Sequence, residues 1–180
     1  MKLWQLILRV LVGALFVGHG TQKLFGWFGG HGLEGTGQAF ESLGLKPGNR
    51  NAVAAGLAEA GGGALLASGV ATPLAGAALT GTMATAIRHV HAPKGPWITD
   101  GGWEYNAVLI AAVLASVEDC AGPGWAAAAA AAGVGGSLGV SYLAQREEAP
   151  PEKPEAVSVP FERDARTGRF RRGEMPVEVS

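Results

Sequence analysis

The stretch LWQLILRVLVGALFVGHGTQKLF, residues 3–25, decides the fold of this chain, because it is apolar along almost its whole length. About 20 helical residues cover the roughly 30 Å hydrocarbon core of a bilayer, so this stretch is long enough to cross a membrane. A cleaved signal peptide is the alternative, and Lys2 favours it. Arg9 interrupts the apolar part, however, and the hydrophobicity continues beyond any small-residue cleavage site. We therefore expect a retained transmembrane helix over Leu3–Phe25.

The charged residues are spread very unevenly along the chain. Lys, Arg, Asp and Glu together number 29 (14 basic plus 15 acidic), and 15 of them fall within residues 145–180. The preceding part is therefore membrane-like in composition, and the last part is water-like. A net charge of −1 gives no electrostatic case for nucleic acid. We expect a lipid bilayer as the main partner and no nucleic acid.

Cys120 is the only cysteine in the sequence. One cysteine cannot make an intrachain disulfide, a paired-thiol redox centre or a cysteine-ligated metal site within one chain. We predict no metal site, and any redox role must take its electrons from elsewhere. The neighbours Glu118 and Asp119 disfavour a thiolate at Cys120, so the thiol is expected to be dispensable.

Four further helices are predicted from the later apolar runs, at Ala52–Val70, Leu74–His91, Trp103–Val117 and Trp125–Leu143. The last run is rich in alanine and glycine, with Gly135 and Gly139 at the spacing that lets helices approach closely. Its alternatives are an alanine-rich helix outside the bilayer and a low-complexity linker. The predicted fold is an all-α integral membrane bundle, with four helices in residues 1–124, an additional transmembrane helix in 125–144 and a charged disordered tail in 145–180.

A glycine-rich connection, Gly26–Arg50, joins the first two predicted spans. Thr36 is expected to cap a short interfacial helix that ends at Gly44. Asn51 is expected to cap the second span.

Both cations of the first helix share one face. Counting about 100° per residue from Arg9, Lys23 falls at about −40°, and His19 flanks the face at about −80°. A lipid-facing position would leave these charges in hydrocarbon, so the face is expected to point into the bundle. Gly13 and Gly20 on the same face would let a neighbouring helix come close.

Five ionisable side chains are predicted to share one half of the bundle. At about 1.5 Å per residue, His19 lies roughly 9 Å below the end of the first span and Glu59 roughly 12 Å below the start of the second. His91 ends the third span and Glu104 begins the fourth on that same side, while Lys23 lies near the mouth. These five residues form the predicted polar intramembrane cluster.

The role of this cluster is left open between several readings. Lys23 and Glu59 could form a buried pair that only fixes helix register. Alternatively, the cluster handles a proton, a ligand or a quinone. A haem held by His19 and His91 is a further reading, which the helix-end position of His91 disfavours.

Arg9 and His89 are secondary candidates. Arg9 lies near the opposite surface, where snorkelling of its side chain toward the headgroups is the simpler explanation. His89 shares a helix face with Thr82 and Thr85.

These residues resemble the pattern of the DoxX family of small bacterial membrane proteins. The family's first-helix pattern of an arginine, a glycine, His-Gly and Lys-Leu-Phe-Gly is matched here by Arg9, Gly13, Phe16, His19, Gly20, Lys23, Leu24, Phe25 and Gly26. The resemblance continues with Glu59, Gly62, Gly63, His91, Pro93, Gly95, Gly101, Gly102 and Glu104. It covers roughly Leu3–Gly124 and is specific as a set, and the residues after Gly124 depart from it.

The resemblance implies a four-helix membrane bundle. Some family members are associated with sulfur or thiol oxidoreductase complexes, including quinone-linked thiosulfate oxidation. We therefore expect a multi-pass protein of the bacterial cytoplasmic membrane, acting as the membrane component of a redox or quinone-linked system. It would then be a non-catalytic subunit beside oxidoreductase partner proteins, with a quinone as the candidate cofactor. A small proton-coupled transporter and a structural partner subunit are the alternatives, and a homo-oligomer is left open.

Overall fold

A computed structural model describes residues 2–148, 161–163 and 170–172 of the chain. The chain divides into two units, Met1–Glu148 and Ala149–Ser180. In the second unit, β1 (Phe161–Arg163) pairs with β2 (Phe170–Arg172) in an antiparallel arrangement. These strands lie within the tail, residues 145–180, that was expected to be disordered. That expectation is wrong for residues 145–148, which are helical, and residues 149–160, 164–169 and 173–180 lie outside the described residues.

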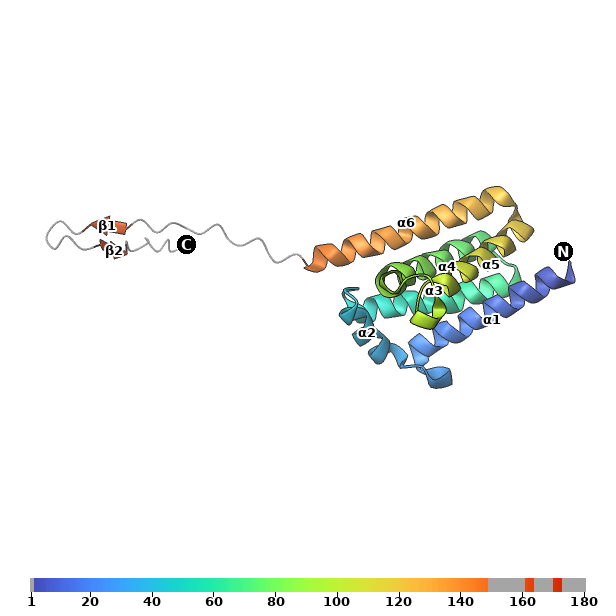
Figure 1. Cartoon of the computed structure of the whole chain (residues 1–180), viewed down its shortest axis with the longest axis horizontal. Helices are drawn as coiled ribbons and strands as arrows, with labels where there is room; N and C mark the ends of the chain where they lie inside the picture. Colours follow the sequence, from blue (N-terminus) through green and yellow to red (C-terminus); the bar gives the residue numbers. More distant parts are fainter. Residues whose placement is uncertain (1, 149–160, 164–169, 173–180) are drawn as a thin grey trace, which may run out of the picture. The chain divides into compact units, whose positions relative to one another are not determined.

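The first unit is a bundle of helices (Figure 1). Its helical elements are α1 (Leu3–Phe25), η1 (Trp27–Gly29), α2 (Gly32–Ser42), α3 (Gly48–Ser68), α4 (Thr72–Ala86), η2 (Ile87–His91), η3 (Ala92–Lys94), η4 (Ile98–Asp100), α5 (Glu104–Ala121) and α6 (Pro123–Glu148). Val12 and Phe16 of α1, Leu66 of α3, Leu79 of α4 and Val113 of α5 are buried together in its core. Packing of this kind holds helices together where lipid replaces water.

The helix α1 has the bounds that the sequence predicted for the first span. It ends where Gly26 takes a left-handed conformation, with φ of 73°, and donates its N–H to the carbonyl of Gln22 at 3.1 Å. α1 packs chiefly against α3. The contact is close, because a Cβ built on Gly13 would lie 2.5 Å from the carbonyl oxygen of Gly63. The prediction of a glycine-lined, inward-facing side of the first helix is confirmed.

Two predicted helix caps in the connection between α1 and α3 are wrong. Thr36 is buried inside α2, which begins at Gly32, and Asn51 lies inside α3, which begins at Gly48. The N–H of Gly48 instead donates to Glu41 Oε1 at 2.6 Å. A carboxylate at this position satisfies an otherwise unpaired helix N–H group and also interacts favourably with the positive end of the helix dipole.

The helices α3 and α4 are antiparallel neighbours joined by a short turn, as predicted. After Ala86 the helix widens into η2, a π-helical turn that carries His89 and His91. Turns of this kind are frequently found at functional sites.

The helix α6 packs against α4 and α5. The close contact is made by Gly133, where an added Cβ would lie 2.7 Å from the carbonyl oxygen of Ala77. Gly135 and Gly139, which were predicted to provide such a contact, have no neighbouring atoms within 4 Å of an added Cβ. That prediction is wrong within the chain, because the packed face of α6 is a different one.

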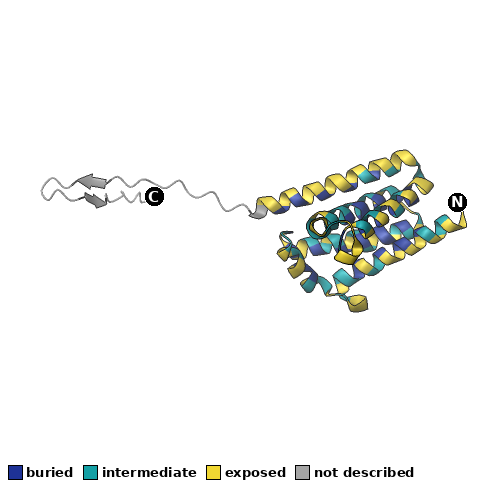
Figure 2. Cartoon of the chain, in the orientation of Figure 1, coloured by how far each residue is buried: buried dark blue, intermediate teal, exposed yellow. Residues whose placement is uncertain are grey.

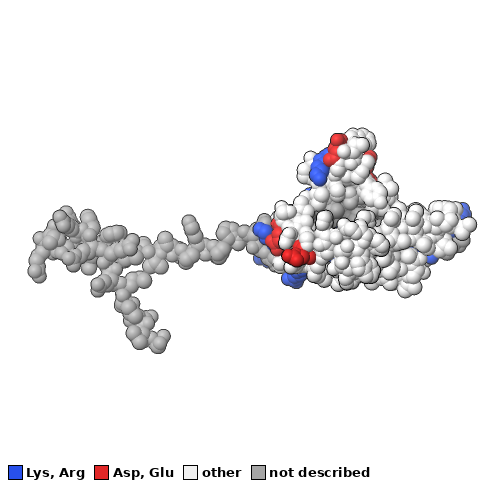
Figure 3. Space-filling model, turned by 90° about the horizontal axis from the view of Figure 1, so that it is seen from below, with Lys and Arg blue, Asp and Glu red and all other residues white. Residues whose placement is uncertain are grey.

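Two helices in the described part of the chain are long and apolar enough to cross a membrane, Leu3–Phe25 and Pro123–Arg146. Only 28% of the apolar window of each is buried inside the unit, and Figure 2 shows broad exposed faces on both helices. On the face seen in Figure 3, charged side chains gather at the ends of the helical unit and leave an uncharged surface between them. An uncharged surface bounded by charges suits a hydrocarbon layer. α3, α4 and α5 do not meet the same criteria of length and composition, so the five-span count stays a prediction.

Candidate functional site

A pocket of about 580 Å³ lies between the helices of the first unit, and all six α-helices contribute to its wall. Most of the wall is made of alanine, glycine and larger apolar side chains. The polar lining residues are His19, Lys23, Asn51, Glu59, Thr82, Thr85, His89, His91, Tyr105, Asn106 and Ser137. A volume of about 300–1,000 Å³ and a mostly apolar wall with few polar groups are typical of small-molecule sites.

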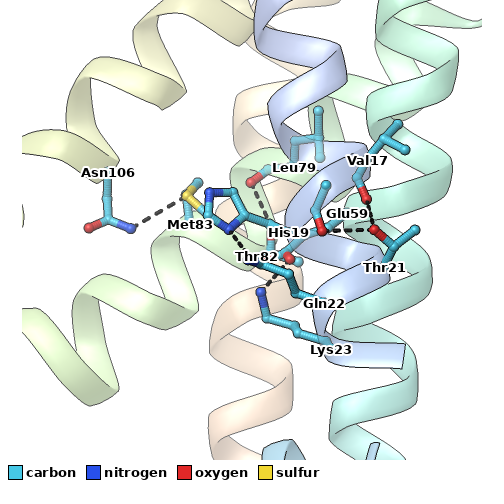
Figure 4. A network of polar contacts seen from close by, with 11 residues as sticks. Val17, His19, Thr21, Gln22, Lys23, Glu59, Leu79, Thr82, Met83 and Asn106 are labelled. Atoms are coloured by element: carbon cyan, nitrogen blue, oxygen red, sulfur yellow. Dashed lines mark hydrogen bonds and ion pairs between the residues drawn. The ribbon is translucent and has the colours of Figure 1, made fainter. Parts of the chain in front are cut away.

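An ion pair between Lys23 Nζ and Glu59 Oε2 lies in this wall (Figure 4). The Glu59 side chain is 5% exposed and the Lys23 side chain is 25% exposed. The two meet because α1 and α3 run in close contact, with Gly20 directly against the backbone of Gly56 and Ala60. A buried carboxylate is strongly unfavourable unless it is paired, so Lys23 makes the burial of Glu59 possible.

His19 lines the same pocket from α1, one helical turn before Lys23. Its Nδ1 lies 3.0 Å from Gln22 Oε1, and Gln22 Nε2 donates to the carbonyl of Phe28 at 3.3 Å. An amide oxygen can only accept, so Nδ1 of His19 carries the hydrogen and Nε2 of the neutral ring is an acceptor. His19 is thus held to the end of α1 while one nitrogen stays able to accept a proton.

His91 lines the pocket from η2. Its Nδ1 lies 2.6 Å from the carbonyl oxygen of Gly101. Because a carbonyl oxygen can only accept, Nδ1 is the donor and Nε2 is the acceptor of the neutral ring. His91 therefore ties η2 to the loop before α5.

His89, the secondary candidate, also lines the pocket. Its Nε2 lies 2.8 Å from Ser141 Oγ, and its Nδ1 lies 3.4 Å from the carbonyl oxygen of Leu43, which makes the second bond a weak one. Ser141 Oγ also donates its single hydrogen to the carbonyl of Ser137 at 3.0 Å. Nε2 of His89 is therefore the donor in its contact with Ser141.

Ser137 and Ser141 were not singled out by the sequence reasoning. They are the only serines of α6, they are spaced four apart and both are buried. Thr85 Oγ1 lies 3.0 Å from Ser137 Oγ, so a second polar contact joins α4 to α6 beside the one made by His89. Paired hydroxyls in an alanine-rich helix are the signal that could have identified this face.

Glu104 does not line the pocket. Its Oε1 accepts a hydrogen bond from the N–H of Ile98 at 2.7 Å, so it holds the loop that precedes α5. The five residues of the predicted cluster are therefore divided. His19, Lys23, Glu59 and His91 line the pocket, and Glu104 has a structural contact outside it.

Arg9 lies toward the opposite end of α1 and is not among the pocket residues. The expectation that it snorkels to the surface is wrong, because the residue is only 8% exposed. Its Nη1 donates to Cys120 Sγ at 3.0 Å.

The helices that place Lys23, Glu59 and His91 around the pocket also carry most of the residues on which the sequence resemblance rests. The DoxX family model matches residues 4–92. The chain belongs to the DoxX family. It is accordingly a membrane protein with helical spans. No curated protein and no solved structure matches the chain.

The DoxX match ends at residue 92, before α5 and α6 begin. Both later helices nevertheless form part of the pocket wall, with Asn106 and Leu109 from α5 and Ser137 and Val140 from α6. In this DoxX protein the pocket is thus completed by helices outside the matched segment.

Proposed function

We propose that this DoxX protein is the membrane component of a quinone-linked redox system and that its pocket holds a quinone head group. The observation that supports the proposal most directly is the Lys23–Glu59 ion pair in the wall of a mainly apolar pocket of about 580 Å³. A charged donor in an apolar membrane site is costly, and residues of this kind usually serve a function.

The donor set of the pocket suits such a ligand. A quinone head is an apolar ring with two carbonyl oxygens that only accept hydrogen bonds. The ring suits the wall of alanine and leucine residues, and Lys23 Nζ supplies charged N–H donors for one oxygen. Glu59 keeps Lys23 positioned at the end of α1.

When bound, a quinone supplies a two-electron acceptor that takes up two protons. His19 and His91 hold ionisable ring nitrogens in the same pocket, and they are the groups that would hold and pass protons there. The electrons come from a partner oxidoreductase, because one cysteine cannot form a dithiol redox centre in the chain. We place the partner's substrates among sulfur or thiol compounds.

We also propose a multi-pass position in the bacterial cytoplasmic membrane. Lys46, Arg50, Lys94 and Arg146 fall in loops or helix ends on the side of the pocket, whereas Lys2 is at the opposite end. The positive-inside tendency then places the basic end in the cytoplasm and the N-terminus outside. Reporter fusions near Lys46 and at residue 180 should both read cytoplasmic. If the two reporters gave opposite readings, the chain would have one span fewer than proposed. If both read external, the orientation of the chain would be reversed.

Purification from native membranes, followed by identification of bound small molecules and co-purifying proteins, tests the function. Co-purification of a quinone with the wild-type protein and its loss from Lys23→Met would support the proposal, with Arg50→Gln as a matched control on an exposed cation. Equal quinone content in Lys23→Met would contradict the proposed site. Solute flux in proteoliposomes without any quinone dependence would support a transporter instead.

A further inference from the structure

A second polar contact lies at the end of the bundle opposite the pocket. Arg9, near the start of α1, donates from Nη1 to Sγ of Cys120, near the end of α5, at 3.0 Å. Arg9 is 8% exposed, whereas Cys120 is exposed. A buried guanidinium therefore touches a sulfur that remains open to reagents.

Within residues 2–148, no carboxylate forms an ion pair with the guanidinium of Arg9. The ion pair found there is Lys23–Glu59, and Nε of Arg9 is buried without a hydrogen-bond partner. Arg9 also lies against Gly69, the C-cap of α3, where an added Cβ would come within 2.7 Å of Nη1. The negative end of the α3 dipole offsets part of the charge. A buried cation that is only partly compensated indicates that an anion belongs at this site.

We propose that Arg9 and Cys120 form a thiol reaction site, in which Cys120 reacts as a thiolate with a low-molecular-weight disulfide. Arg9 is the positioning residue, because its positive charge stabilises the negative sulfur, and thiolates beside an arginine are reactive. Glu118 and Asp119 on the same helix act against this charge, but both are exposed and their charges are screened by solvent. Arg9, by contrast, is buried and in direct contact with the sulfur. The expectation that Cys120 is dispensable considered only those sequence neighbours.

The reaction is an exchange. The sulfur of Cys120 attacks one sulfur of the disulfide, a new S–S bond forms, the original S–S bond breaks, and the released thiolate takes a proton from water. Cys120 is oxidised to a mixed disulfide and one half of the reagent is reduced to a thiol. The chain has no second cysteine to resolve this product, so it persists until an external thiol attacks it.

The test uses the purified full chain in detergent with an anionic aryl disulfide that releases a coloured thiolate. The wild type should form one adduct per chain, and Cys120→Ser should form none. Arg9→Gln should react roughly tenfold more slowly at neutral pH, with Arg9→Lys between the two. Lys2→Gln, at the same end of α1, is the matched control and should react at the wild-type rate.

Thermal unfolding of each variant is measured first, because a disrupted bundle would also separate Arg9 from Cys120. A neutral alkylating reagent, iodoacetamide, separates nucleophile activation from attraction of the anionic reagent, and Arg9→Gln should slow both reactions. Wild-type rates in Arg9→Gln, or slowing with the anionic reagent alone, would overturn the proposal.

Discussion

The two inward-facing cations of α1 are paired in different ways. Lys23 meets the carboxylate of Glu59 in the wall of the pocket, whereas Arg9 meets the thiol of Cys120 at the other end of the bundle. A carboxylate beside a lysine supplies a lasting negative charge, whereas a thiol is neutral until it loses a proton. The comparison teaches that a cation of α1 can be paired either with a fixed charge, as in the wall of the pocket, or with a thiol, whose charge can change.

The largest expected effect is that of Glu59→Ala. This substitution leaves Lys23 partly buried without its counter-ion, and we expect a loss of about 3 kcal/mol in the free energy of unfolding. Glu34→Ala, on an exposed residue of α2, should change it by less than about 1 kcal/mol. Denaturant unfolding of the purified protein measures both.

The double variant Lys23→Met/Glu59→Leu removes both charges and should recover most of that loss, because replacing a buried pair by apolar side chains is often neutral. A double variant as unstable as Glu59→Ala would show that the ion pair itself holds α1 to α3.

Gly20→Ala should have the next largest effect, about 1–3 kcal/mol of destabilisation, because the added methyl group collides with the backbone of α3. Gly18→Ala is the matched control on the same helix, where an added Cβ meets nothing within 4 Å. That variant should be neutral or stabilising by up to about 1 kcal/mol. Thermal unfolding with the two variants side by side checks the prediction, and equal effects would contradict the close α1–α3 contact.

The smallest effect is expected from Cys120→Ser. A hydroxyl can still accept the hydrogen bond from Arg9, so the free energy of unfolding should change by less than about 1 kcal/mol. A loss comparable to that of Glu59→Ala would mean that the two cations of α1 are paired in the same way after all. The same unfolding measurement decides this.

Much of the fold could be predicted where the signal is local. The bounds of α1 follow from an apolar run that starts after Lys2 and stops at Gly26. The cap at Thr36 was wrong because α2 begins earlier, at Gly32. The cap at Asn51 was wrong because α3 begins at Gly48, whose N–H is bound by a side chain from another helix, that of Glu41. The packed face of α6 was also missed, since glycine spacing alone does not say which side of a helix meets its neighbour.

The candidate site, too, could be predicted only in part. Depth and helical phase were sufficient to predict Lys23 and Glu59 in the same half of the bundle, where they pair. Glu104 was grouped with them because the path of the loop before α5 could not be derived from the sequence. Arg9 was assigned to the surface because its sulfur partner lies 111 residues away along the chain.

Binding of a short-tailed quinone to the purified Lys23→Met/Glu59→Leu double variant tests the central claim most directly. This variant is expected to stay folded, because it removes both charges of the pair together. It also removes the charged donor from the pocket. We predict that the wild type binds the quinone, that Glu34→Ala binds it equally well, and that the folded double variant binds at least tenfold more weakly, since a charged hydrogen bond contributes about 1.5–3 kcal/mol. Wild-type affinity in a folded double variant would contradict the claim that the Lys23–Glu59 pair forms the ligand site.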